Sequence, residues 1–157
     1  MATVWVVDDE APVREVLEAM LQQLGHTCRL FEDGPALLSA YRRDEVDLVI
    51  SDMRMPGMDG MALLRALREK DPHVVIIFLT GYPTVQDGVE AIRLGASDYL
   101  TKPFRMEEIN LRVLRALENR DLNQQLRRSR ILAWLLIGSL PFWFVMGLAL
   151  HLILACP

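Results

Sequence analysis

The sequence is poor in cysteine and has no excess of positive charge. Its two cysteines, Cys28 and Cys156, lie far apart and form neither a metal-binding spacing nor a disulfide framework. We therefore expect Cys28 to be a small strand or core residue and Cys156 to be a free thiol. The formal net charge is -4 with 24% charged residues, so the composition gives no reason to predict nucleic-acid binding by this chain.

Charged residues are also missing from the C-terminal part of the chain. The range 131–157 contains no Asp, Glu, Lys or Arg, so the hydrophobic content of 52% is unevenly distributed. Residues 131–156 form an uncharged run of 26, and about 20 apolar residues suffice to cross a bilayer. Arg127, Arg128 and Arg130 precede this run, and a basic flank favours a cytoplasmic orientation of what comes before it. We predict a transmembrane helix in 131–157; the alternatives are a buried helix of a truncated domain and a frameshifted or artefactual end.

Two further features are not recognisable in the sequence. The N-terminus begins directly with an apolar strand pattern at 3–7, without a signal peptide, so we expect the first domain to be cytoplasmic. No Gly-rich loop ending in Gly-Lys-Ser/Thr is present, and an uncharged tail is an unsuitable helix-turn-helix. We therefore expect neither ATPase activity nor DNA binding from this chain.

The sequence does contain a regular alternation of apolar runs and helical patterns. Short apolar runs predict five strands, at 3–7, 26–31, 46–50, 74–79 and 96–100. Helical periodicity predicts helices at 13–24, 35–41, 60–69, 84–94 and 105–130. Strands that alternate with helices through short connections form a parallel sheet covered on both faces. We therefore predict a doubly wound α/β domain.

Polar residues stand at the carboxyl ends of four predicted strands: Asp8, Asp9, Asp52, Thr80 and Lys102. Because the carboxyl ends of parallel strands meet at one edge of the sheet, we expect these side chains to converge there. Taken alone, each has an ordinary explanation: Asp52 as a helix cap, Thr80 as a strand end, Lys102 as a surface amine. The conjunction of all five favours a functional site.

The chemistry of such a cluster follows from its charges. Three converging carboxylates repel one another, and a hard divalent cation removes the repulsion; carboxylates, a backbone carbonyl and water suit Mg²⁺. Lys102 adds a mobile positive charge and Thr80 a hydroxyl donor, which suit a phosphoryl group rather than proton transfer. Asp52 would then be the nucleophile that forms an acyl phosphate. A haloacid-dehalogenase-like phosphatase also uses such an aspartate, but it needs an Asp-x-Asp pair, whereas Asp8 and Asp9 are adjacent.

Four motifs in roughly the first 105 residues resemble those of a two-component response-regulator receiver domain. They are residues 7–10 (Val-Asp-Asp-Glu), 52–60 (Asp-Met-Arg-Met-Pro-Gly-Met-Asp-Gly), 80–82 (Thr-Gly-Tyr) and 102–104 (Lys-Pro-Phe). The stretches 4–9 and 88–100 are most similar to the nitrogen-regulator (NtrC) subfamily. The resemblance implies a flavodoxin-like (βα)5 fold, similar to that of a chemotaxis receiver, with strand order 2-1-3-4-5.

The resemblance also implies a role for each residue of the predicted site. Asp52 is the expected phosphoacceptor. Asp9, Asp52 and the backbone carbonyl of Arg54 are the expected direct Mg²⁺ ligands, while Asp8 is expected to act largely through water. The ammonium group of Lys102 is expected to contact the phosphoryl group.

A switch is the second implication of the resemblance. Thr80 and Tyr99 are similar to the switch pair of receivers, in which the hydroxyl turns toward the phosphoryl oxygen and the aromatic ring moves inward. The added charge would repack the face formed by the fourth helix, fifth strand and fifth helix. The peptide bond after Lys102 is expected to be cis. Arg54 and Tyr82 occupy positions that tune the lifetime of the phosphoryl group in such domains.

The predicted organisation has three parts. A receiver domain occupies 1–120, its fifth helix runs into a helical linker at 105–130, and the apolar segment 131–157 follows. The linker has no sustained heptad repeat, so it is either a single amphipathic helix packed on the domain or part of a dimeric coiled coil. The segment 131–156 would anchor a cytoplasmic receiver to the inner membrane.

Together these features predict a phosphoacceptor of a two-component phosphorelay, with no enzymatic activity beyond its own phosphorylation and dephosphorylation. Its expected partners are a sensor histidine kinase or phosphotransfer protein, a downstream protein and, through the linker, a second copy. Its expected cofactor is Mg²⁺. The competing hypothesis is a truncated remnant of an NtrC-type transcriptional activator that has lost its ATPase and DNA-binding domains.

Overall fold

The computed structural model of this chain describes residues 1–43, 45–122 and 125. The strands are β1 (Thr3–Val7), β2 (Thr27–Phe31), β3 (Leu48–Asp52), β4 (Ile76–Thr80) and β5 (Asp98–Thr101). The helices between them are α1 (Ala11–Gln23), α2 (Gly34–Ala40), α3 (Gly60–Lys70) and α4 (Val85–Arg93). Residues 106–122 form a further helix, the C-terminal helix.

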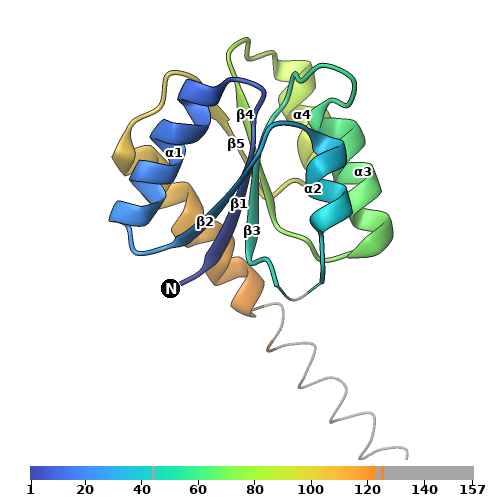
Figure 1. Cartoon of the computed structure of the whole chain (residues 1–157). Coiled ribbons are helices and arrows are strands. Elements are labelled where there is room, and N and C mark those ends of the chain that lie inside the picture. The colour runs from blue at the N-terminus through green and yellow to red at the C-terminus, as the bar shows by residue number, and fades with distance from the viewer. Residues whose placement is uncertain (44, 123–124, 126–157) are drawn as a thin grey trace, which may run out of the picture. The chain divides into compact units, whose positions relative to one another are not determined.

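The strands form one parallel five-stranded sheet in the order β2-β1-β3-β4-β5. Helix α1 and the C-terminal helix as far as Glu118 cover one face, and α2, α3 and α4 cover the other (Figure 1). The predicted flavodoxin-like fold, with its strand order, is therefore confirmed.

Both faces of the sheet are buried, which is why its inner strands are apolar almost throughout. Successive residues of a strand point to opposite faces, so β1 divides its side chains between two cores. Val4 and Val6 pack on the α1 side with Leu17 and Val113, while Trp5 and its neighbours pack on the α2 side. Helices therefore pack on both faces of the sheet, and this packing fixes the position of its carboxyl edge.

Two predicted site residues belong to strands rather than to the loops after them. Asp52 is the last residue of β3 and pairs in register with Leu79, and Thr80 is the last residue of β4 and pairs with Thr101. The N–H group of Met53 donates to the Leu79 carbonyl at 2.9 Å, which keeps the backbone extended to the edge of the sheet. The main chain at both positions is therefore fixed by ladder hydrogen bonds.

By their internal contacts the residues divide into two units, Met1–Glu118 and Asn119–Pro157. The predicted transmembrane segment 131–157 and most of the linker beyond residue 122 lie outside the described residues. Within the described part of the chain, no helix combines the length and the apolar character needed to cross a membrane.

Candidate functional site

The carboxyl edge of the sheet brings together four of the predicted residues from separate strands. Asp8 follows β1 and Asp52 closes β3, and these two strands are neighbours. Thr80 closes β4 and Lys102 follows β5, which are the next two strands across the sheet. Residues 94 positions apart in sequence, Asp8 and Lys102, are thereby placed in direct contact.

The ammonium group of Lys102 joins the two buried carboxylates. Its Nζ lies 2.7 Å from Asp8 Oδ2 and 2.8 Å from Asp52 Oδ1, with Glu10 Oε1 at 3.3 Å. Asp8 is fully buried and Asp52 is 6% exposed, so the charges meet in a site largely closed to water. Such close pairing compensates two carboxylates that would otherwise repel each other.

The other oxygen of each carboxylate accepts a hydrogen bond from the main chain. Asp8 Oδ1 accepts from the N–H of Glu10 at 2.9 Å, and Asp52 Oδ2 accepts from the N–H of Arg54 at 2.8 Å. Each carboxylate thus has one oxygen on the ammonium group and one on the turn that follows its strand. This arrangement fixes the orientation of the Asp52 carboxylate.

Burial and pairing shift the pKa values of both partners. Burial raises the pKa of Asp8 above its ordinary value of 3.8, although the hydrogen bond and charge of Lys102 oppose the shift. For Lys102, burial lowers the pKa, but hydrogen bonds to Asp52 and Asp8 outweigh it and raise the pKa above its ordinary value of 10.5. Lys102 is therefore a firmly charged group at neutral pH.

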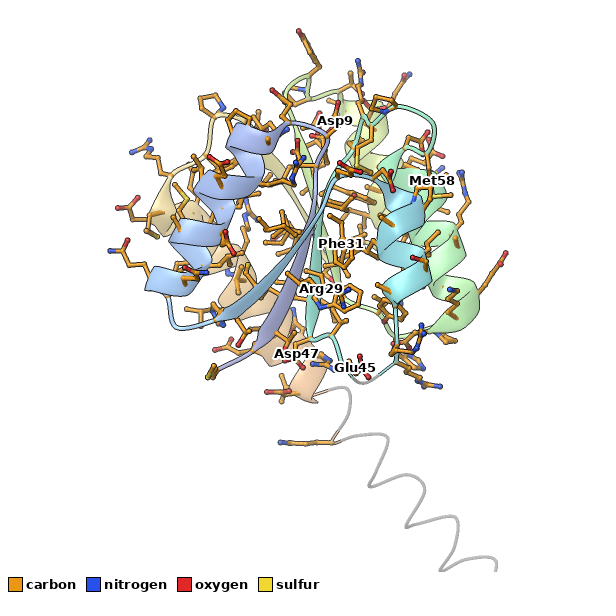
Figure 2. All side chains as sticks on the ribbon, in the orientation of Figure 1. Asp9, Arg29, Phe31, Glu45, Asp47 and Met58 are labelled. Carbon is orange, nitrogen blue, oxygen red and sulfur yellow. The ribbon has the colours of Figure 1, made fainter. Side chains whose placement is uncertain are left out.

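Asp9 is not gathered with Asp8 and Asp52. It lies at the carboxyl edge, at the opposite end of the sheet from Asp47 (Figure 2), and its side chain is exposed. Among the described residues, no group of three or more His, Cys, Asp or Glu side chains is arranged to hold a metal ion. Two predicted metal-binding carboxylates therefore converge on Lys102, and the third faces solvent.

The two predicted switch residues are held differently. Thr80 is buried, and its hydroxyl oxygen accepts a hydrogen bond from the N–H of Tyr82 at 3.2 Å. Tyr99 packs against the core on the α2 side, and its hydroxyl is buried without a hydrogen-bond partner among the described residues. The peptide bond between Lys102 and Pro103 is cis, as the sequence predicts.

Several residues to which the sequence analysis assigns no role also shape this edge. Glu10 is a third carboxylate near Lys102, and Arg14 donates from α1 to the backbone carbonyl of Asp8. Gly60 closes the loop after β3, because its N–H group donates a hydrogen bond to the Met53 carbonyl at 3.0 Å. The position of Glu10 two residues after Asp8 is a usable signal, whereas the contact of Arg14 depends on how α1 packs.

Comparison with known proteins decides the family. Residues 4–114 match the model of the response regulator receiver domain, which is more than half of the chain. The chain belongs to the response regulator receiver family. Receivers are phosphoacceptors rather than catalysts, they interact with histidine kinases or phosphotransfer proteins, and they generally bind Mg²⁺ for phosphorylation.

The curated relatives of this receiver are longer proteins. The DNA-binding transcriptional regulator NtrC of Escherichia coli (strain K12) is 41% identical over 128 residues, covering 82% of this chain and 27% of NtrC. The C4-dicarboxylate transport transcriptional regulatory protein DctD of Rhizobium meliloti is 36% identical over 130 residues, covering 81% of this chain and 28% of DctD. The chain thus spans about a quarter of the length of these relatives.

Solved receiver structures have the same fold. NtrX from Brucella abortus aligns with a TM-score of 0.77 at 32% identity, covering 82% of this chain and 30% of NtrX. A receiver domain protein from Clostridium thermocellum aligns with a TM-score of 0.71 at 26% identity, covering 78% of this chain and 98% of that protein.

Proposed function

We propose that this receiver takes a phosphoryl group on Asp52 from a sensor histidine kinase or a phosphotransfer protein. The observation that carries the proposal is the ammonium group of Lys102, which lies 2.8 Å from Asp52 Oδ1 and bridges to the buried Asp8. An aspartate that merely capped a helix would not need an ammonium partner at 2.8 Å. The site instead holds the Asp52 carboxylate in a fixed orientation beside the Lys102 ammonium group.

The proposed reaction is attack by an Asp52 carboxylate oxygen on the phosphorus of a phosphohistidine. An oxygen–phosphorus bond forms while the phosphorus–nitrogen bond breaks, and the imidazole nitrogen leaves with the electron pair. The ammonium group of Lys102 would then contact the phosphoryl oxygens, which carry the negative charge after the transfer. The N–H group of Arg54 donates a hydrogen bond to Asp52 Oδ2, and this bond keeps the carboxylate from rotating during the transfer.

The donor chemistry of the edge fits the Mg²⁺ that receivers generally bind. Asp8 and Asp52 already converge on one cation, the Lys102 ammonium group, at 2.7 and 2.8 Å. In the proposed set, Asp9, Asp52 and the backbone carbonyl of Arg54 would hold the metal directly and Asp8 would act largely through water, so that all the donors are oxygens. When bound, the metal supplies charge neutralisation for the transferring phosphoryl group.

Phosphorylation would then act through the switch residues. The phosphoryl group would add nearly two negative charges beside Thr80, whose hydroxyl accepts from the N–H of Tyr82 and can donate its own proton to a phosphoryl oxygen. Tyr99 lies on the face of α4 and β5 that phosphorylation would repack. A downstream protein would bind to that face. Removing the Thr80 hydroxyl would therefore separate phosphorylation from partner binding.

The test of the function is phosphoryl uptake from a small donor, phosphoramidate with Mg²⁺, followed by intact mass. We expect the wild-type chain to gain one phosphoryl group and Asp52→Asn to gain none. The matched control is Asp59→Asn in the same loop: Asp59 caps α3 by accepting from the N–H of Ala62 at 2.7 Å, and asparagine caps equally well. Uptake by Asp52→Asn at the wild-type rate would overturn the assignment.

We also propose that the segment 131–156 anchors this cytoplasmic receiver to the inner membrane. The support is its uncharged length and the basic residues before it. The competing proposal is a truncated remnant of an NtrC-type transcriptional activator, and its support is that the match covers 27% of NtrC.

Membrane fractionation with carbonate extraction separates these two proposals. The full chain is compared with a variant that ends at Arg130. Retention of only the full chain in the bilayer is the result expected of an anchored receiver. If carbonate releases both, the anchor is excluded and the activator proposal is favoured.

A further inference from the structure

Helix α4 is tied to the rest of the receiver by two ion pairs of different kinds. Glu90 pairs with Arg65 of α3, with Oε1 3.1 Å from the guanidinium nitrogen. Asp87, one turn earlier, pairs with Arg54, with Oδ2 3.7 Å from the guanidinium nitrogen. The first pair joins two helices, whereas the second joins α4 to the loop that follows the phosphoacceptor strand.

Arg54 contacts both the phosphoacceptor and α4. Its backbone N–H donates to Asp52 Oδ2 at 2.8 Å, while its side chain reaches across to Asp87. The guanidinium carbon also lies 5.6 Å from the centre of the Tyr82 ring, in the loop that leads into α4. One residue therefore connects the carboxylate of Asp52 to the first turn of α4.

The contact between Asp87 and Arg54 is an ion pair without a hydrogen bond. The Oδ2 atom of Asp87 is buried without a hydrogen-bond partner among the described residues, and 3.7 Å is too long for a hydrogen bond. A polar cavity of about 240 Å³ lies among the loop after β3, α3 and α4, and Arg54, Arg65 and Asp87 all line it. The guanidinium group of Arg54 thus has room to move away from Asp87, which attracts it by charge without a hydrogen bond.

We propose that Asp87 is a positioning residue that holds the Arg54 side chain on α4 and away from Asp52 until phosphorylation. The inference rests on the proposed function of Asp52. A phosphoryl group would place nearly two negative charges beside Arg54 and compete with the single charge of Asp87. Release of the guanidinium group would then free the first turn of α4. Because coupling is reciprocal, loosening this pair must also favour the phosphorylated state.

The test is the affinity for beryllofluoride, a phosphoryl mimic, in the presence of Mg²⁺. We expect Asp87→Asn to bind it about 1.5- to 5-fold more tightly than wild type, the range that partly exposed ion pairs give. Asp87→Glu keeps the charge and should restore the wild-type affinity. The matched control is Glu90→Gln, which breaks the other ion pair of α4 without touching Arg54 and should leave the affinity unchanged.

A double-mutant cycle separates this coupling from a simple effect on the helix. Asp87 lies in the first turn of α4, where an acidic residue is favourable in any case. In an Arg54→Ala background, Asp87→Asn should therefore no longer change the affinity for beryllofluoride. An equal effect of Asp87→Asn in both backgrounds, or no effect in either, would overturn the proposal.

A second measurement keeps the test independent of the proposed function. Hydrogen exchange of the α4 amides in the unphosphorylated chain should be faster in Asp87→Asn than in wild type, and this difference should disappear in the Arg54→Ala background. Failure of the wild-type chain to bind beryllofluoride would count against the function of Asp52, while unchanged exchange would count against the role of Asp87.

Discussion

Replacing Lys102 by methionine is expected to lower the free energy of unfolding by about 3–5 kcal/mol at pH 7, the cost of leaving a buried charge without its partner. Its ammonium group lies within 2.8 Å of oxygens from both Asp8 and Asp52, which are 0% and 6% exposed. Methionine fills a similar volume but leaves two buried carboxylates facing each other. Urea denaturation of the full chain, followed by the circular dichroism of its helices, measures the loss.

The loss of stability in Lys102→Met should become smaller as the pH falls. Burial already raises the pKa of Asp8, and the hydrogen bond and charge of Lys102 oppose that rise. Without Lys102 the folded-state pKa of Asp8 is higher still, so the folded variant takes up a proton at a pH where the unfolded chain does not. The variant should therefore regain stability relative to wild type as the pH falls from 7 to 5.

The chain offers a matched control, because Lys70 is its only other lysine. Lys70 is exposed and donates to the Leu38 carbonyl, so Lys70→Met should change the free energy of unfolding by less than about 1 kcal/mol and without this pH dependence. Equal losses in the two variants, or a Lys102→Met deficit that stays constant between pH 7 and 5, would contradict the bridging role of Lys102.

Replacing Gly60 by alanine is expected to cost about 3 kcal/mol of stability, because overpacking a rigid site forces the backbone to shift. A Cβ atom at Gly60 would lie 2.6 Å from the backbone oxygen of Asp52 and 2.8 Å from the ring of Phe78. Neither neighbour can move freely, since Asp52 is held in the sheet and Phe78 is fully buried. The substitution should also slow phosphoryl uptake, because it displaces the end of β3.

The control for this prediction is Gly88→Ala in the middle of α4. A Cβ atom there meets nothing within 4 Å, and alanine is the better helix former, so we expect a gain of about 0.5–1 kcal/mol. Urea denaturation of both variants makes the comparison. A Gly60→Ala variant as stable as wild type would show that the end of β3 is not packed as tightly as the structure indicates.

The sequence predicts the fold because the fold rests on local periodicity. Apolar runs such as 74–79 are bounded by helical patterns, and parallel topology then brings Asp8, Asp52 and Lys102 to one edge without further information. The strand order came from the resemblance to receivers rather than from these patterns. The apolar runs predict ends of β3 and β4 that are one or two residues too early, because ladder hydrogen bonds, rather than hydropathy, determine where a strand stops.

The finer geometry of the site depends on contacts between elements. The sequence places Asp9 beside Asp8, but only the turn after β1 decides that Asp8 is buried on Lys102 while Asp9 faces solvent. The pairing of Arg54 with Asp87 depends on where α4 sits against the loop after β3, and no local pattern encodes it. The close approach of Gly60 to the Asp52 carbonyl is likewise a product of packing.

The most direct test of the central claim is to locate the phosphoryl group on the wild-type chain. After phosphorylation from phosphoramidate with Mg²⁺, reduction by borohydride converts an aspartyl phosphate to homoserine, and peptide mass spectrometry then identifies the converted residue. Conversion at Asp52 alone is the predicted result. Conversion at Asp8, Asp9 or Asp59, or a phosphoryl group that resists borohydride, would contradict the assignment of Asp52 as the phosphoacceptor.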